Sequence, residues 1–210
     1  MALNARPLIL AEGKSVRMGS PKHLLELPNG TPLYPHQINL LRRVCPEAPT
    51  IYISLTKSSQ LDDFLREAVT NTSPEPPVLI LDDLQNNNTH ESGGPAQGLL
   101  SATWLVVAVD CPLLSCGLLR VLRRVYQPPV TCFRNAEGFC EPLVAIWSPE
   151  ALGKVVECAS KGMLPGPSSI IWEIGGQQIE LSGADAIQLR NVNTRGDWEA
   201  VWSLMDISGD

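Results

Sequence analysis

Short apolar segments alternate along this chain with stretches in which apolar residues recur every three or four positions. The first pattern is typical of buried strands and the second of amphipathic helices. Their alternation predicts an α/β protein, a Rossmann-like three-layer α/β/α single domain over residues 1–210 with a mostly parallel, mixed sheet. Strands are predicted at Pro7–Ala11, Thr50–Ser54, Val78–Leu81, Trp104–Val109, Val130–Arg134, Pro142–Trp147 and Ala186–Leu189.

Three stretches between these strands have the spacing of amphipathic helices: Pro35–Val44, Ser59–Val69 and Ser115–Tyr126. In the third stretch Ser115 is suited to the N-cap, and one face is apolar. That face consists of Leu118, Leu119, Leu122 and Val125. The opposite face carries Arg120, Arg123 and Arg124, which we expect to be solvated.

Net charge and cysteine usage exclude several classes of protein. A formal net charge of −6 and a pI near 5.1 argue against the basic faces of nucleic-acid and membrane-surface proteins. The 6 cysteines form no C-x-x-C pair and the 3 histidines are widely spaced, so buried reduced thiols are expected rather than a zinc site. The N-terminal residues lack a secretory apolar core, and no apolar run approaches the roughly 20 residues of a membrane span. We therefore expect a cytoplasmic protein that binds neither nucleic acid nor a membrane.

The first predicted strand runs directly into a loop rich in glycine and cations. Gly13 and Gly19 allow backbone N–H groups to approach an anion closely. Ser20 and Pro21 suit the N-cap and first position of a following helix, whose positive end would face the loop. The cations of the loop are Lys14, Arg17 and Lys22. A triphosphate is the ligand that this pattern favours, and a solvated charged turn is the alternative.

An aspartate ends the most apolar predicted strand. Asp110 follows the run Trp104–Val109, and ligands of open α/β sheets bind at the carboxyl ends of strands. Its carboxylate should therefore point into the site. Mg²⁺ typically takes one or two carboxylates together with phosphates and water. Asp110 is thus predicted to bind Mg²⁺, the alternative being a turn or N-cap aspartate.

The segment Leu8–Lys22 resembles the signature loop of the molybdenum-cofactor guanylyltransferases and their cytidylyltransferase relatives, written L-A-G-G-x-S-x-R-M-G-x-x-K. The matching positions are Leu10, Ala11, Gly13, Ser15, Arg17, Met18, Gly19 and Lys22. The resemblance implies that Arg17 and Lys22 act on the phosphates, and that the nucleotide also contacts Leu10, Ala11, Gly13 and Ser15. Glu12 departs from the family, which has a glycine there. A carboxylate beside a triphosphate is repulsive, so Glu12 predicts a weakened nucleotide affinity.

The resemblance extends along most of the chain. The D-x-P-x-L form at Asp110 is similar to the family's metal-binding motif, which assigns metal binding to that residue. The region from Leu81 to Gly98 resembles the part of the family that helps to hold the nucleoside. The nucleoside-binding residues implied there are Asp82, Asp83, Gly94 and Pro95.

Two later segments continue the likeness. Glu141–Trp147 resembles the segment that precedes the acceptor-side helix, and Asn191–Asp197 resembles the motif N-x-N-T-x-x-D. By this resemblance Asn191 and Asn193 contact the acceptor or complete the metal sphere. For Asn191 the alternative is an Asx turn that caps a helix from about Gly196.

Together these parts imply Mg²⁺-dependent nucleotidyl transfer, in which a phosphate monoester attacks the α-phosphorus of a nucleoside triphosphate and pyrophosphate leaves. Asp82 or Asp83 could accept hydrogen bonds from the N–H edge of guanine, which cytosine does not match, so GTP is favoured. By resemblance the acceptor is molybdopterin or its molybdenum form.

One departure keeps other functions open. Only residues 99–103 separate Gly98 from the strand near Trp104, and five residues give about 7.5 Å of helix, little more than one turn. The crossover should therefore be distorted. The alternatives are a degenerate nucleotide-binding or interaction module without turnover, and a nucleotidyltransferase that uses CTP or another small phosphate acceptor.

Overall fold

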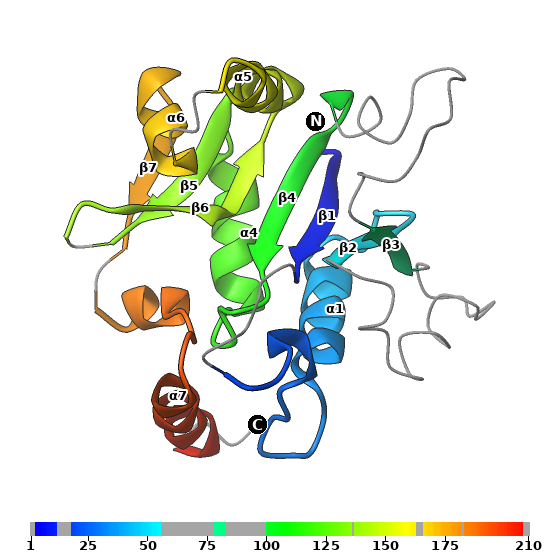
Figure 1. Cartoon of the computed structure of the whole chain (residues 1–210), viewed down its shortest axis with the longest axis vertical. Coiled ribbons are helices and arrows are strands. Elements are labelled where there is room, and N and C mark those ends of the chain that lie inside the picture. The colour runs from blue at the N-terminus through cyan, green and yellow to red at the C-terminus, as the bar shows by residue number, and fades with distance from the viewer. Residues whose placement is uncertain are drawn as a thin grey trace.

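The computed structural model describes residues 3–11, 18–55, 78–82, 100–135, 137–162, 166–181 and 183–207. Its centre is a seven-stranded sheet in the order β3-β2-β1-β4-β6-β5-β7 (Figure 1). The strands are β1 (Ala5–Leu10), β2 (Ile51–Leu55), β3 (Val78–Asp82), β4 (Thr103–Ala108), β5 (Val130–Arg134), β6 (Cys140–Trp147) and β7 (Gln177–Glu180). All of these except β7 coincide with predicted strands, so the apolar runs located most of the sheet.

The sheet is mixed, as predicted. β1 pairs in parallel with β2 and β4, and β2 pairs in parallel with β3. β6 is antiparallel to both β4 and β5, and β7 is parallel to β5. The carboxyl ends of β3, β2, β1 and β4 therefore meet at one edge, and the start of the reversed strand β6 reaches the same edge.

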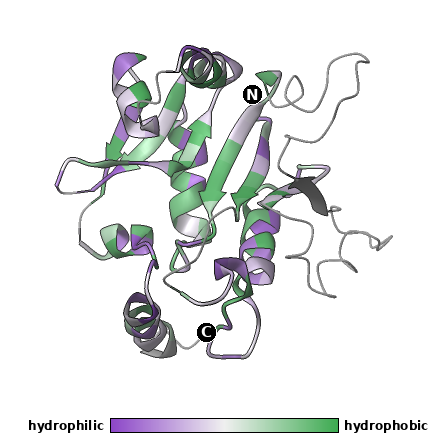
Figure 2. Cartoon of the chain, viewed as in Figure 1, coloured by the Kyte–Doolittle hydropathy of each residue, from purple (hydrophilic) through white to green (hydrophobic). Residues whose placement is uncertain are grey.

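Helices cover both faces of the sheet and give the predicted three layers. They are α1 (Leu33–Val44), α4 (Cys116–Val125), α5 (Pro149–Ser160), α6 (Pro167–Glu173) and α7 (Arg195–Ile207). Successive side chains of β4 enter two separate apolar clusters because a strand alternates its faces. Leu105 and Val107 pack with residues of α1 and α4, whereas Trp104 and Val106 pack with residues of α5 and α6. Figure 2 shows the resulting amphipathicity of α1, which carries both apolar and polar colours.

The predicted strand Ala186–Leu189 is wrong, because residues Gly183–Leu189 form the 3₁₀ helix η4. Residues three apart share a face of a 3₁₀ helix. Ala186 and Leu189 accordingly pack against the apolar cluster of α1 and α4, and Ile187 is exposed. The prediction also missed β7, which reads Q-Q-I-E and lies at the edge of the sheet, where a strand needs few apolar residues.

The helix predicted after Ser20 is much shorter than expected. Only Lys22–Leu24 form a helical turn, the 3₁₀ helix η1, and Pro21 is its N-cap without a side-chain cap. The chain then turns back through a β-bridge that closes residues 26–32. The chain leaves helical conformation at Leu25, which is extended (ψ 132°) and whose carbonyl accepts from the Leu33 amide at 2.8 Å. Pro28 would in any case prevent a longer helix, since proline disfavours helical conformation in the residue before it.

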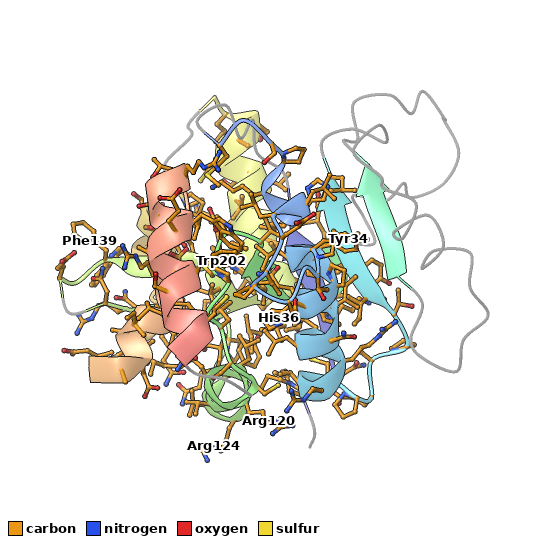
Figure 3. The ribbon with its side chains drawn as sticks, turned by 90° about the horizontal axis from the view of Figure 1, so that it is seen from below. Tyr34, His36, Arg120, Arg124, Phe139 and Trp202 are labelled. Carbon is orange, nitrogen blue, oxygen red and sulfur yellow. The ribbon has the colours of Figure 1, made fainter. Side chains whose placement is uncertain are left out.

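The arginines of α4 divide into two kinds. Arg120 and Arg124 are exposed, as predicted (Figure 3). Arg120 also donates from Nη2 to the Arg43 carbonyl of α1 at 3.0 Å. Arg123 corrects the prediction, because its side chain is only 16% exposed. Its guanidinium donates to the Val44 carbonyl and forms an ion pair with Glu47. Arg123 therefore joins α4 to the carbonyl-rich end of α1, where a cation is favourable.

Two further expectations concern the thiols and the helices. All six cysteines are free, and all but the partly buried Cys116 are buried, which confirms the expected buried thiols. The predicted helix Ser59–Val69 lies outside the described residues. Residue 99 of the crossover before β4 lies outside them too, and residues 100–102 lead directly into β4 at Thr103. Within the described part of the chain, none of the helices combines the length and apolar character that a membrane span requires.

Candidate active site

A lysine, an aspartate and an asparagine meet at the carboxyl edge of the parallel strands. The Lys22 ammonium lies 3.0 Å from Asp110 Oδ2 and 2.8 Å from Asn193 Oδ1. The side chains of Lys22 and Asp110 are 16% and 21% exposed. Partial burial reduces the screening of this ion pair, because salt and water screen exposed charges most. The remaining exposure leaves both charged groups in contact with solvent, where a ligand would arrive.

Asp110 is held in place by the strand beside it and by a helix beneath it. β4 ends at Ala108, and the Val109 amide donates to the Leu10 carbonyl at 3.0 Å, one step beyond the strand. Gln37 of α1 is 1% exposed and donates from Nε2 to the carbonyls of Ala108 at 3.2 Å and Val109 at 3.3 Å. Both contacts fix the two residues that precede Asp110.

The segment before α7 is bonded directly to Asp110, since the Val192 amide donates to the Asp110 carbonyl at 2.8 Å. α7 begins at a capping box, in which the Asp197 amide donates to the Thr194 hydroxyl at 3.2 Å. The hydroxyl donates back to Asp197 Oδ2 at 2.8 Å, and the Asn193 and Thr194 amides donate to the same oxygen. The Thr194 hydroxyl and these two amides lower the pKa of Asp197. The cap thus anchors the residues that carry Asn193 to the site.

A second polar group lies beside the ion pair. The buried Cys111 thiol donates to Asn191 Oδ1 at 2.8 Å, and Asn191 Nδ2 donates to Glu141 Oε2 at 3.4 Å. Asn191 therefore bonds to Cys111 and does not cap α7, so the Asx-turn alternative is wrong. Burial raises the pKa of Cys111 well above its ordinary value, and the Asp110 carboxylate adds to the rise. Burial also raises the pKa of Glu141, against the opposing effect of hydrogen bonds from the Leu143 amide and Asn191.

Glu141 faces this group because β6 is irregular near its start. The register between β5 and β6 shifts at Cys132 and Phe133, where extra residues of β6 bulge from the pairing. Cys140 and Ala145 pack in the same apolar cluster, although an unbroken strand would place residues five apart on opposite faces. The irregularity therefore turns Glu141 toward the face of the sheet on which Asn191 lies.

The structure brings four of the predicted side chains together: Lys22, Asp110, Asn191 and Asn193. Leu10 ends β1, and the following Ala11 donates its amide to the Ser54 carbonyl of β2 at 2.9 Å. Asp82 is the last residue of β3, so its backbone lies at the same edge of the sheet. The other predicted residues lie outside the described part of the chain: Gly13, Ser15, Arg17, Asp83, Gly94 and Pro95.

Sequence reasoning missed three residues that the structure places at or under the site. Cys111 follows Asp110, and nothing in the sequence pairs it with Asn191. Glu141 is a carboxylate that directly precedes an apolar run. Because β6 is antiparallel to β4, the start of β6 lies beside the end of β4, and this would have indicated Glu141 as a site residue. Gln37 interrupts the apolar face of α1, and a polar residue on such a face often has a partner in the core.

The oxygens of the site suit a hard divalent cation. Mg²⁺ prefers carboxylate and carbonyl oxygens and keeps several waters or phosphate ligands. Asp110 and Asn193 each direct an oxygen at the same cationic group, the Lys22 ammonium, so their side chains already favour positive charge between them. The residues present therefore fit Mg²⁺, with Asp110 as the carboxylate. No cluster of three or more metal-ligating His, Cys, Asp or Glu side chains occurs within the described ranges.

The chain matches known proteins over most of its length. Residues 7–171 match the MobA-like NTP transferase domain. The chain is 31% identical over 212 residues to a probable molybdenum cofactor guanylyltransferase of Synechococcus elongatus, covering 95% of this chain and 98% of that protein. A nucleotidyl transferase of Methanothermobacter thermautotrophicus shares the fold with a TM-score of 0.68 at 15% identity, over 98% and 99% of the two chains. Molybdopterin-guanine dinucleotide biosynthesis protein A of Archaeoglobus fulgidus does so with a TM-score of 0.61 at 16% identity, over 96% and 99%.

Proposed function

This chain belongs to the MobA-like NTP transferase family, and we propose that it transfers GMP from GTP to molybdopterin or its molybdenum form. It is a nucleotidyltransferase of that family. The names of its curated relatives, from Synechococcus elongatus and Rhodopirellula baltica, support guanine as the base and the molybdenum cofactor as the acceptor.

One observation carries the proposal. The Lys22 ammonium bridges Asp110 and Asn193 at the carboxyl edge of the parallel strands, close to the end of β1. This is the edge at which open α/β sheets bind their ligands. A cation held between two oxygens, at the exit of the strand that precedes a glycine-rich loop, is suited to receive the phosphates of a nucleotide.

The reaction joins an oxygen of the acceptor phosphate to the α-phosphorus of GTP. The bond between that phosphorus and the oxygen bridging to the β-phosphate breaks, and pyrophosphate leaves with the electron pair. A phosphate monoester has a second pKa of about 6, so the nucleophile is already ionised at pH 7 and needs no general base. Alignment and charge neutralisation therefore carry the catalysis.

The chain's own residues divide these tasks. Lys22 neutralises phosphate charge, and Arg17 shares this role by its place in the signature loop. Asp110 would hold Mg²⁺, and the bound ion would supply charge neutralisation to the phosphates. Asn193 presents an amide oxygen beside both charged groups and so fixes the position of the lysine. Asn191 holds the segment that carries Asn193. Asp82 and Asp83 serve the guanine base.

Pyrophosphate release tests the proposal. The protein is incubated with Mg²⁺ and each nucleoside triphosphate in turn, with and without molybdopterin, and pyrophosphate is measured. Release that needs both GTP and molybdopterin supports the proposal. Pyrophosphate release with CTP instead of GTP would show that the base in the proposal is wrong. Release with another phosphate in place of molybdopterin would show that the acceptor is wrong. Nucleotide binding without pyrophosphate release under any condition would identify a binding module without turnover.

A further inference from the structure

Cys111 is part of the apolar cluster of α1 and α4, but its thiol meets the polar groups of the site, and among the described residues its nearest acceptor is Asn191. Its sulfur lies 2.8 Å from Asn191 Oδ1 and 3.9 Å from Asp110 Oδ1. The residue is 0% exposed, so the thiol is not available to solvent. In this position the S–H group donates to the oxygen of the Asn191 side-chain amide and restrains that side chain.

Glu141 holds the other end of the same amide. Asn191 Nδ2 donates to Glu141 Oε2 at 3.4 Å, and the second oxygen of Glu141 accepts from the Leu143 amide at 3.3 Å. The oxygen and the nitrogen of the Asn191 side chain are therefore both directed at protein groups. A carboxylate can only accept, so Glu141 takes the nitrogen of the amide and leaves its oxygen facing the Cys111 S–H group.

The neighbouring asparagine is placed differently. Asn193 directs its oxygen at Lys22, and between the two asparagines the Val192 amide donates to the Asp110 carbonyl at 2.8 Å. Three contacts, from Asn191, Val192 and Asn193, thus tie one short segment to the residues around Asp110. If the contacts of the Asn191 side chain are lost, we expect Val192 and Asn193 to be held less firmly beside Asp110.

We propose that Cys111 and Glu141 are positioning residues that hold Asn191, so that the segment 191–193 presents Asn193 to Lys22 and to the reacting phosphates. The role in turnover rests on the proposed function, whereas the holding of the segment does not. The structure thereby separates two asparagines that the sequence motif treats alike. Asn191 anchors the segment, and Asn193 faces the substrate.

The anchoring is tested first without any substrate. Amide hydrogen exchange of Val192 and Asn193 is measured by NMR in the wild type and in Cys111→Ala, Cys111→Ser and Cys158→Ala. Cys158→Ala is the matched control, because it removes another buried thiol, from α5 on the other face of the sheet. We expect exchange at both positions to rise roughly tenfold in Cys111→Ala, the size of effect that losing one hydrogen bond produces. Cys111→Ser keeps a donor and should stay within about twofold of the wild type, as should Cys158→Ala.

Turnover is then measured on the same variants and on two changes at Glu141. With GTP, molybdopterin and Mg²⁺, Cys111→Ala should lower kcat roughly tenfold and change the KM for GTP less than about twofold, with recovery in Cys111→Ser. Glu141→Gln keeps an acceptor for Asn191 and should retain more activity than Glu141→Leu. The inference is overturned if Cys111→Ala exchanges like Cys158→Ala, or if Cys111→Ser is as impaired as Cys111→Ala. Absence of pyrophosphate release by the wild type would instead overturn the proposed function and leave the exchange result standing.

Discussion

Each half of the sheet supplies one carboxylate to the site, and the two halves do so in opposite ways. Val107 of β4 pairs with Val144 of the antiparallel β6. Asp110 lies three residues after Val107, and Glu141 lies three residues before Val144. The parallel half therefore delivers its carboxylate where a strand ends, and the antiparallel half delivers its carboxylate where a strand begins.

The two carboxylates have different partners. Asp110 faces the Lys22 ammonium at 3.0 Å, whereas the hydrogen bonds to Glu141 come from the amides of Asn191 and Leu143. Burial raises the pKa of Glu141. A carboxylate beside a cation can serve a metal or a phosphate-binding lysine, and one held by neutral N–H groups can fix its neighbours. Both carboxylates lie at the same edge of the sheet, so their roles differ because their hydrogen-bonding and ionic partners differ.

Removal of the two carboxylates should give unequal losses of activity. We expect Asp110→Ala to lower pyrophosphate release roughly 10²- to 10³-fold while the protein stays folded, because the residue stabilises charge at the exposed end of a strand. Glu141→Ala should lower it about tenfold, the cost of one weakened hydrogen bond that positions a neighbour. Steady-state kinetics and thermal melting measure both. Equal losses would break the comparison, and unfolding of Asp110→Ala would show that its role is structural.

The support beneath β4 is the next test, and it concerns stability. Gln37→Glu would place a carboxylate against the carbonyls of Ala108 and Val109 in a fully buried position, which should cost roughly 3 kcal/mol or more of the free energy of unfolding. Gln37→Met has similar volume and should cost about 1 kcal/mol, since no partner of Gln37 Oε1 exists in the described structure and that oxygen is removed too. Urea denaturation compares the two. A stable Gln37→Glu protein would mean that β4 is not held from α1.

A third test sharpens the nucleotide side. Glu12 stands where the resembled family has glycine, and Glu12→Gly should tighten the binding of nucleoside triphosphate by about 1 kcal/mol, or roughly fivefold, by removing a like charge. Titration calorimetry of the two proteins measures the difference. Weaker binding in Glu12→Gly would indicate that this carboxylate helps to hold a metal.

The smallest expected effect is at the cap of α7. The Thr194 hydroxyl and two amides lower the pKa of Asp197 below its ordinary value of 3.8, so the carboxylate stabilises the fold above that value and stops doing so as the pH falls through the lowered pKa. Asp197→Asn should therefore melt slightly below the wild type at pH 7, and the gap should close in strong acid. Thermal melting curves of both proteins from pH 7 to pH 2 measure this difference in melting temperature. A difference in melting temperature that persists in acid would show that the effect does not come from the charge of Asp197.

The sequence located the parts of the fold that have strong apolar patterns. α1, α4, β4 and β5 follow from their apolar spacing, and Ser115 caps α4 through a bond from the Leu118 amide as expected. The weak patterns failed, because an edge strand such as β7 needs little apolar surface and a 3₁₀ helix such as η4 shows a spacing that resembles a strand over four residues.

The site was predictable only in part. Asp110 follows from the rule on strand ends, and Lys22, Asn191 and Asn193 follow from the resembled motifs. Cys111 and Asn191 are 80 positions apart, and no local pattern announces their bond. Glu141 depends on both the reversal of β6 and its irregular register, neither of which a local apolar pattern specifies.

The bond between the Val192 amide and the Asp110 carbonyl also has a consequence for how the protein is made. The match to the family domain stops at residue 171, and the segment that completes the site comes about twenty residues later. During synthesis β1 and β4 can pair well before that segment leaves the ribosome, because chains emerge at about 5–20 residues per second. We therefore expect this edge of the sheet to form before Asn193 is available to Lys22. Assembly of the proposed substrate site therefore waits for residues 191–193, and a product cut before residue 190 would lack the amide of Asn193.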